Sequence, residues 1–298
     1  MTPGAKLREL IQSDKILVAP GAYDALTARL VEHAGFSAVY FTGAGLSYTS
    51  LARPDFGLLT MSEMVTRAGQ IARAVDVPVL ADIDSGYGGV LNVMRTIEEF
   101  EKAGICGVHI EDQTFPKRCG LLAGKSLIST EEMVQKIGAA VAARRDPDFV
   151  IMARSDAFVI GGLDELIGRG KAYVEAGADV FFVEAAGTSV ADLEAVAQAI
   201  DAPLITDMVE GGKAPFLSAD ELEGIGYDIV IFPNSLTRVF ARIGLELLQT
   251  LRKTGTTRSW EDRMFSFPEL LDLLGLDEVL AIEDRFRVPS TVIQGKSG

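Results

Sequence analysis

The chain has 298 residues, of which 48% are hydrophobic, and it carries a formal net charge of -14 at neutral pH. This acidity argues against nucleic acid and anionic membrane surfaces as partners, because both are negatively charged themselves. Two cysteines, Cys106 and Cys119, are too few for a disulfide framework, and no apolar stretch reaches the roughly 18 residues that span a membrane. We therefore expect a cytoplasmic protein without a leader segment, built around one large domain.

A short apolar segment followed by a longer amphipathic one recurs along the whole chain. The apolar segments are mostly continuous rather than alternating, as in strands that are buried on both faces of a parallel sheet. The predicted strands are Ile16–Pro20, Ala38–Thr42, Val77–Ile83, Gly107–Glu111, Phe149–Arg154, Val180–Glu184, Pro203–Thr206 and Ile229–Phe232. The predicted helices between them include Ala22–His33, Ser62–Ala74, Asn92–Ala103, Thr130–Arg144, Leu163–Ala176 and Val190–Ile200. This alternation predicts a closed (β/α)₈ TIM barrel. An open doubly wound sheet is the alternative, weakened by the lack of a GxGxxG motif after the first strand.

The segment after the eighth predicted strand is longer than a barrel needs. Asn234 to about Thr250 is predicted to form a final helix, and Phe265–Arg285 contains two short helical patterns. We predict a catalytic barrel domain over residues 1–255 and a helical tail over residues 256–298. The apolar side chains of the tail are expected to pack on the barrel or on a partner subunit. Gln294–Gly298 is predicted to be disordered.

Polar side chains end five of the predicted strands, at the barrel face where active sites of this architecture lie. They are Asp82 and Asp84, Glu111 and Asp112, Arg154 to Asp156, Glu184, and Asp207. Crowded carboxylates repel one another unless a cation lies between them, and hard oxygen ligands favour Mg²⁺, with Mn²⁺ as an alternative. We predict a metal site at Asp82, Asp84 and Glu111, in which only one or two need touch the ion directly. The competing interpretation, that these acids only increase solubility, explains a single residue better than the whole set.

The expected partner is a small-molecule carboxylate. Arg154 suits one because a planar guanidinium binds a carboxylate bidentately, although an ion pair with Glu184 or Glu111 is the alternative. Thr42–Ser47 offers glycine-flanked backbone N–H groups at the barrel mouth, which could cradle carboxylate oxygens.

Phe115–Lys125 is a cationic, glycine-containing segment in an otherwise acidic chain, and we predict that it forms a mobile active-site lid. Cys119 lies beside basic residues, so we expect a lowered pKa and a role as acid or base. Cys106 is predicted to be inert core. His109 shares a strand face with Glu111, one layer lower, and is predicted to be a core histidine.

Taken together, these motifs resemble the isocitrate lyase / phosphoenolpyruvate mutase superfamily, over the stretch from Val18 to Pro233. The resemblance implies a Mg²⁺-binding barrel that acts on 2-oxo or 2-hydroxy acids. It also implies a homotetramer, a dimer of dimers in which the eighth helix is exchanged between subunits. By resemblance, the residues of the metal and substrate shell are Asp55, Asp82, Asp84 (the direct ligand) and Glu111, and those of the substrate pocket are Tyr40, Gly45, Leu46, Gly120, Arg154 and Asp207.

The sequence Lys117-Arg118-Cys119-Gly120 is similar to the gating loop of the carbon–carbon lyase branch, that of 2-methylisocitrate and 2,3-dimethylmalate lyases, and Glu184 also matches that branch. The resemblance implies cleavage of a 2-hydroxy di- or tricarboxylate to a 2-oxo acid such as pyruvate plus a carboxylate, with Cys119 protonating the carbanionic product.

Two positions depart from the branch. Leu121 stands where the lyases carry His. Asp207 stands where the family commonly has Asn, which disfavours a second substrate carboxylate at that point and makes methylisocitrate, with its three carboxylates, a less secure substrate. An alkyl-malate is therefore credible beside methylisocitrate. An oxaloacetate decarboxylase or hydrolase on the same metal site, and a catalytically inactive binding subunit, are the alternatives.

Overall fold

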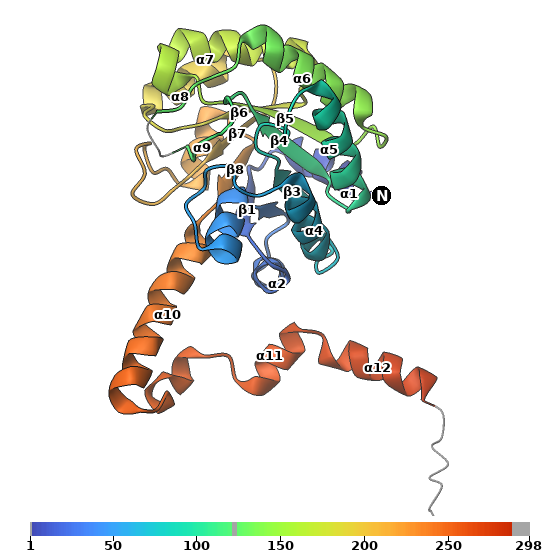
Figure 1. The fold of residues 1–298 in the computed structure, drawn as a ribbon, viewed down its shortest axis with the longest axis vertical. Coiled ribbons are helices and arrows are strands. Elements are labelled where there is room, and N and C mark those ends of the chain that lie inside the picture. Colours follow the sequence, from blue (N-terminus) through green and yellow to red (C-terminus); the bar gives the residue numbers. More distant parts are fainter. Residues whose placement is uncertain (1, 121–123, 288–298) are drawn as a thin grey trace, which may run out of the picture. The chain divides into compact units, whose positions relative to one another are not determined.

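Eight parallel strands close into a barrel in chain order in the computed structural model, which describes residues 2–120 and 124–287 (Figure 1). Strand β1 pairs with β8 from Leu17 opposite Ile229 to Pro20 opposite Phe232, which closes the ring. The strands are β1 (Leu17–Ala22), β2 (Val39–Phe41), β3 (Val79–Asp82), β4 (Gly107–Glu111), β5 (Val150–Ser155), β6 (Val180–Val183), β7 (Leu204–Asp207) and β8 (Ile229–Phe232). The predicted TIM barrel and its eight strands are confirmed, each prediction overlapping an observed strand.

Helices connect the strands and surround the barrel (Figure 1). Side chains of Asp24, Thr60 and Ser189 cap α2, α4 and α8 in reciprocal capping boxes, which satisfy backbone N–H groups that have no helical partner. The helices of this unit are α1 (Pro3–Ile11), α2 (Ala25–His33), α3 (Gly43–Leu46), α4 (Met61–Ala72), α5 (Val90–Lys102), α6 (Thr130–Ala143), α7 (Phe158–Glu175), α8 (Val190–Ala199) and α9 (Ala219–Ile225), with a π-helical turn η1 at Ser47–Leu51.

Two buried clusters hold the barrel together. One lies between the strands and the surrounding helices, and the other fills the barrel interior with inward-facing residues such as Leu80, Met152 and Ile205. Leu7 and Ile11 of α1 belong to the interior cluster, and Arg8 hydrogen-bonds to Asp179 at 2.9 Å. These contacts place α1 across the end of the barrel where the strands begin, so the site must open at the other end.

The sequence missed or misplaced several helices. Helices α1, α3 and α9 were not predicted. Helix α2 begins at Ala25 rather than Ala22 because Asp24 is its N-cap. Helix α7 begins at Phe158 rather than Leu163, since Gly162, with a φ of 79°, lets two helical segments run together across a kink.

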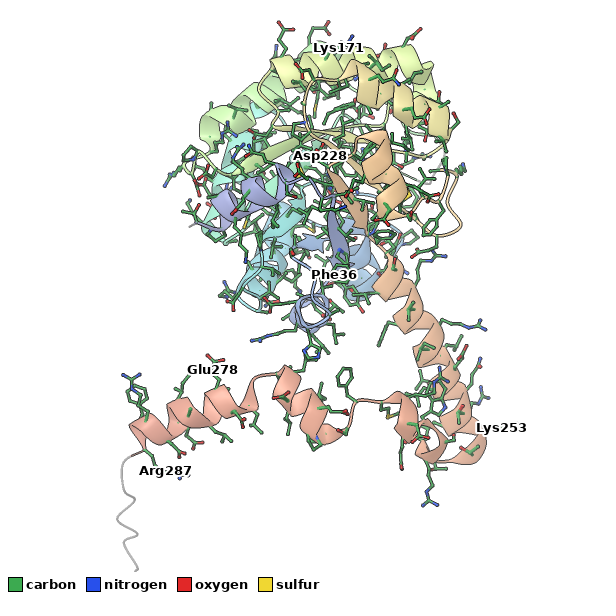
Figure 2. The ribbon with its side chains drawn as sticks, turned by 180° about the vertical axis from the view of Figure 1, so that it is seen from behind. Phe36, Lys171, Asp228, Lys253, Glu278 and Arg287 are labelled. Carbon is green, nitrogen blue, oxygen red and sulfur yellow. The ribbon has the colours of Figure 1, made fainter. Side chains whose placement is uncertain are left out.

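The chain divides into two compact units, residues 1–242 and residues 243–298, and the division falls inside α10 (Ser235–Thr254). Helix α10 ends at Thr254, next to the domain boundary that the sequence predicts after residue 255. The second unit continues with a 3₁₀ helix η2 (Arg258–Arg263), α11 (Phe267–Leu273) and α12 (Leu276–Phe286). Side chains of α12 such as Glu278 extend outward from its ribbon (Figure 2), and no residue of α12 is buried. The disorder predicted for 294–298 concerns residues outside the described range.

Candidate active site

The strand register brings the predicted polar residues to one end of the barrel. Asp82 pairs with His109, Glu111 with Arg154, and Asp207 with Ile231 on neighbouring strands. Residues two apart on a strand face the same way, so Glu111 lies one layer above His109, and Arg154 one layer above Met152. Except for Asp207, which is partly exposed, all of these residues are buried. The predicted carboxylate ring is therefore one cluster in space.

A small cavity of about 40 Å³ opens at this end of the barrel. This volume holds only a few waters, so a dicarboxylate can enter only if some lining residues move. The lining residues are Tyr40, Thr42, Ala44, Asp55, Asp82, Lys117, Cys119, Gly120, Arg154, Phe182, Glu184, Asp207, Val209, Ile231, Pro233 and Asn234. Gly45, Leu46, Asp84 and Glu111, which were also predicted for the site, do not line it.

Lys117 occupies the centre of the acidic cluster. Its Nζ lies 2.7 Å from Asp55 Oδ2 and 2.6 Å from Asp84 Oδ1, and its side chain is 3% exposed. Burial alone would lower the pKa of Lys117, but the carboxylates of Asp84, Glu111 and Asp82 raise it well above its usual value. The ammonium is thus a fixed positive charge among carboxylates.

The cluster suits a hard divalent cation by its chemistry. Burial raises the pKa of Asp84 to about 7 against the opposing charge of Lys117, and burial raises the pKa of Glu111 as well. Oxygen Oε1 of Glu111 is buried without a hydrogen-bond partner among the described residues. Within that same part of the chain, no three His, Cys, Asp or Glu side chains are arranged as a ready-made metal cage. The donors therefore fit an ion held by one or two carboxylates and by water, rather than an all-protein cage.

Arg154 also lines the cavity, and three carboxylates surround it. Its Nε and Nη2 atoms donate to the two oxygens of Asp156 at 3.0 and 3.1 Å, and Nη2 lies 2.6 Å from Glu184 Oε2. Its Nε is also 3.4 Å from Glu111 Oε2. The bidentate edge that was expected to hold a substrate carboxylate is therefore taken by Asp156, and the alternative ion pairs with Glu184 and Glu111 are both present.

Cys119 and Gly120 approach the cavity from the segment after β4. The backbone N–H of Cys119 donates to Asp55 O at 3.3 Å, and Cys119 is half-buried. A Cβ atom on Gly120 would lie 2.4 to 2.5 Å from atoms of the Glu184 carboxylate, so a larger residue there requires Glu184 or the segment that carries Gly120 to shift. The predicted lid at 115–125 and the departure at Leu121 include residues 121–123, which lie outside the described residues.

Tyr48, on η1, was not predicted for the site. Burial, together with the neighbouring Cys119 and Asp55 groups, raises the pKa of Tyr48 to about 12. Its hydroxyl group also takes part in a side-chain hydrogen bond with Cys119. No strand ends at Tyr48, so the rule used to select site residues from the sequence could not find it.

The turn after β2 presents Thr42 and Ala44 to the cavity rather than Gly45 and Leu46. The backbone N–H of Gly45 donates to Thr42 Oγ1 at 3.0 Å, and that of Leu46 donates to Thr42 O at 3.0 Å. Both predicted cradle donors are thus engaged inside the turn.

Tyr40 lines the cavity, and His109 is hydrogen-bonded to it from the barrel interior. His109 is fully buried, as predicted, and its Nε2 lies 2.8 Å from the Tyr40 hydroxyl. Burial lowers the pKa of His109 to about 4, so the ring is neutral at pH 7.

The similarity to known proteins extends over nearly the whole barrel. A family model described as phosphoenolpyruvate phosphomutase matches residues 7–251. The chain belongs to the PEP mutase/isocitrate lyase superfamily. Lyases are among its relatives in this superfamily. The 2,3-dimethylmalate lyase of Eubacterium barkeri is 46% identical over 96% of this chain and 99% of its own. The 2-methylisocitrate lyase of Aeropyrum pernix is 44% identical over 92% of this chain and 87% of its own.

Solved structures of the superfamily show the same fold. An oxaloacetate acetylhydrolase in complex with 3,3-difluorooxalacetate has a TM-score of 0.89 and 35% identity, covering 95% of this chain and 97% of that one. A phosphonopyruvate hydrolase in complex with oxalate and Mg²⁺ has a TM-score of 0.87 and 33% identity, covering 96% and 99% of the two chains. The present chain is a lyase of this superfamily. No helix in its described part has the length and apolarity to cross a membrane.

Proposed function

We propose that the protein is a Mg²⁺-dependent carbon–carbon lyase that cleaves a 2-hydroxy di- or tricarboxylate, of the alkyl-malate or methylisocitrate type, to a 2-oxo acid such as pyruvate plus a carboxylate. One observation carries this proposal. The same cavity is lined by Asp82, which belongs to the carboxylate cluster, by Arg154 and by Cys119. A cation site, an anion-binding group and a proton donor are what such a cleavage requires.

Asp82, Asp84 and Glu111 would hold the metal, Asp84 directly. Bound there, Mg²⁺ would stabilise the negative charge that develops on the oxygens of the 2-oxo acid, with Mn²⁺ as the alternative ion. The related phosphonopyruvate hydrolase, in complex with Mg²⁺ and oxalate, supports this choice of ion. Lys117, with Asp55, would keep the remaining carboxylates charged and in place.

The chain's own residues account for the rest of the reaction. Arg154 would bind the carboxylate next to the 2-hydroxyl group. A base would take the proton of the hydroxyl group. The carboxylates of Asp55 and Glu184 line the cavity and are the candidates for this base. The bond between C2 and C3 then breaks, and its electron pair passes to C3, next to the second carboxylate. Cys119 would donate the proton that C3 needs, so no further reactant is consumed.

A dicarboxylate of the alkyl-malate type suits the lining of the cavity better than a tricarboxylate. Apolar groups of Phe182, Val209, Ile231 and Pro233 line the cavity together with the acidic side chain of Asp207. Burial, and after it the charge of Glu184, raises the pKa of Asp207 to about 7. A third substrate carboxylate placed there would meet an acid instead of a cation, whereas a methyl group would meet carbon.

We also propose a cytoplasmic homotetramer, in which α10 is exchanged between paired subunits and the tail covers a partner. Apolar side chains of the second unit are exposed, including Leu248, Phe267 and Phe286 at 61, 77 and 71%. Exposed apolar groups at this density support burial against another copy of the chain.

The test of the proposed reaction is Cys119→Ser, with Cys106→Ala as the matched control at the other cysteine. In D₂O, the wild type is expected to release a carboxylate with one deuterium at the former C3. Cys119→Ser should lower turnover by at least about 10²-fold, the usual contribution of one positioned proton donor. Cys106, which is buried in the barrel interior, should be replaceable without loss of turnover.

A Cys119→Ser variant that retains wild-type turnover would contradict the lyase assignment. The oxaloacetate acetylhydrolase neighbour gives the second candidate, hydrolysis of oxaloacetate to oxalate and acetate. That reaction consumes water and forms no pyruvate, so product analysis by NMR separates the two.

A further inference from the structure

Three of the five N–H groups of Arg154 face carboxylates that belong to the protein. The Nε–Nη2 edge is closed by Asp156, and the second Nη2 hydrogen faces Glu184. No hydrogen bond or ion pair within the described residues involves Nη1 of Arg154. The guanidinium carbon also lies 5.2 Å over the centre of the Phe182 ring, which packs against its plane. Nη1, with its two hydrogens, is therefore the nitrogen left for a ligand in the cavity.

Asp156 is held more firmly than an ordinary ion-pair partner. It is 1% exposed, and its Oδ1 lies 2.5 Å from Lys125 Nζ. Burial alone would raise the pKa of Asp156, but the charges of Arg154 and Lys125 lower it to about 2. Two cations on one carboxylate keep it ionised, so it can accept both hydrogen bonds from the guanidinium.

A buried cluster behind the site fixes the backbone of Asp156. The N–H group of Asp156 donates to Asp112 Oδ1 at 3.1 Å. The other oxygen of Asp112 accepts from Ser155 Oγ at 2.6 Å, Tyr173 OH at 2.8 Å and Arg169 Nη1 at 3.2 Å. Asp112 is fully buried, and none of its partners here lines the cavity. This cluster joins β4, β5 and α7 behind Arg154 and has no direct access to substrate.

We infer that Asp156, fixed by the cluster around Asp112, is a positioning residue that orients Arg154 so that Nη1 receives the substrate carboxylate. The inference rests on the proposed role of Arg154 in substrate binding. It changes the expected recognition, since the substrate is held through one terminal nitrogen rather than across the bidentate edge. Asp156 and Asp112 act through Arg154 and do not touch the reacting atoms.

Asp156→Asn tests this because two effects of the substitution have opposite signs. Loss of a negative charge next to Arg154 would by itself strengthen anion binding. Loss of orientation would weaken it, because an amide cannot accept both hydrogen bonds and its NH₂ group opposes the guanidinium. The probe is oxalate in the presence of Mg²⁺, with the dissociation constant measured by calorimetry. We expect oxalate to bind about 10-fold more weakly, the size of a typical coupling between contacting residues.

A double-mutant cycle with Arg154→Lys separates positioning from a general structural effect. Lysine has no bidentate edge, so Asp156→Asn should change oxalate affinity less than about 2-fold in that background. Glu165→Gln is the matched control, since Glu165 pairs with Arg169 at 2.8 Å but contacts neither Asp112 nor Asp156. Should Asp156→Asn fail to fold, Tyr173→Phe removes one donor to Asp112, and about 3-fold weaker binding is expected in the same cycle.

Tighter or unchanged oxalate binding by Asp156→Asn would overturn the inference. Equal losses of oxalate affinity in the wild-type and Arg154→Lys backgrounds would overturn it as well. The cycle does not depend on turnover. If no 2-hydroxy acid is cleaved by the wild type, the proposed function fails while the oxalate data still decide the role of Asp156.

Discussion

Replacing Gly120 by alanine would test whether catalysis requires the close contact between Gly120 and the Glu184 carboxylate. The added Cβ would lie 2.4 to 2.5 Å from the Glu184 carboxylate, about an ångström closer than an ordinary contact. Glu184 is 2% exposed and lies 2.6 Å from Arg154, so it cannot retreat without breaking that ion pair. Overpacking of this kind costs about 1–3 kcal/mol. That penalty corresponds to a loss of about 5- to 150-fold in kcat/KM if Gly120 and Glu184 must be in contact during catalysis.

The assay is kcat/KM on a 2-hydroxy dicarboxylate together with Tm. We expect a small change in Tm, because the segment that carries Gly120 can relieve the clash by moving away from Glu184. Gly138→Ala on α6 is the matched control, since nothing lies within 4 Å of its added Cβ. It should leave kcat/KM unchanged and stabilise the helix by about 0.5–1 kcal/mol. A Gly120→Ala enzyme with the kcat/KM of the wild type would refute the reasoning.

Three other changes give distinct outcomes. Asp207→Asn should improve kcat/KM for a tricarboxylate relative to a dicarboxylate. It should also raise Tm more at pH 8 than at pH 4. The pKa of Asp207 is about 7 in the folded protein against the usual 3.8, so the wild type loses stability as the pH rises through that range, and the variant does not. An equal effect of the substitution on Tm at both pH values would contradict this. Lys117→Met should abolish cleavage yet strengthen Mn²⁺ binding, measured by electron paramagnetic resonance. The ammonium of Lys117 lies 2.6 Å from Asp84, so its positive charge opposes a cation bound to that carboxylate. Weaker Mn²⁺ binding by the variant would show that Lys117 supports the metal instead. Removal of residues 256–298 should lower the number of subunits in the assembly, obtained from the mass measured by light scattering and the mass of the shortened chain. An unchanged number of subunits would show that the tail is not needed for assembly.

The sequence predicted the barrel well because its evidence was local and repeated. Buried parallel strands have continuous apolar runs, and Ile229–Phe232 and Gly107–Glu111 were located to the residue. Short helices such as α3 and α9 were missed because four and seven residues give too little periodicity.

The site was predicted as a set of residues but not as a set of pairs. Strand ends identify Asp82, Arg154 and Glu184 as neighbours, since parallel strands end at the same face. Which of them bind one another depends on side-chain rotamers and on distant segments. The pairing of Asp156 with both Arg154 and Lys125, and the approach of Tyr48 to Cys119, are contacts of that kind.

A panel of 2-hydroxy di- and tricarboxylates, assayed with Mg²⁺ and after complete metal removal, tests the proposed activity most directly. Release of the 2-oxo acid and of the carboxylate is followed by NMR. An alkyl-malate should yield pyruvate and a monocarboxylate in equal amounts with Mg²⁺, and neither product once the metal has been removed. Cleavage that survives metal removal would contradict the metal site at Asp82, Asp84 and Glu111. Absence of a 2-oxo acid from every member of the panel would contradict the lyase.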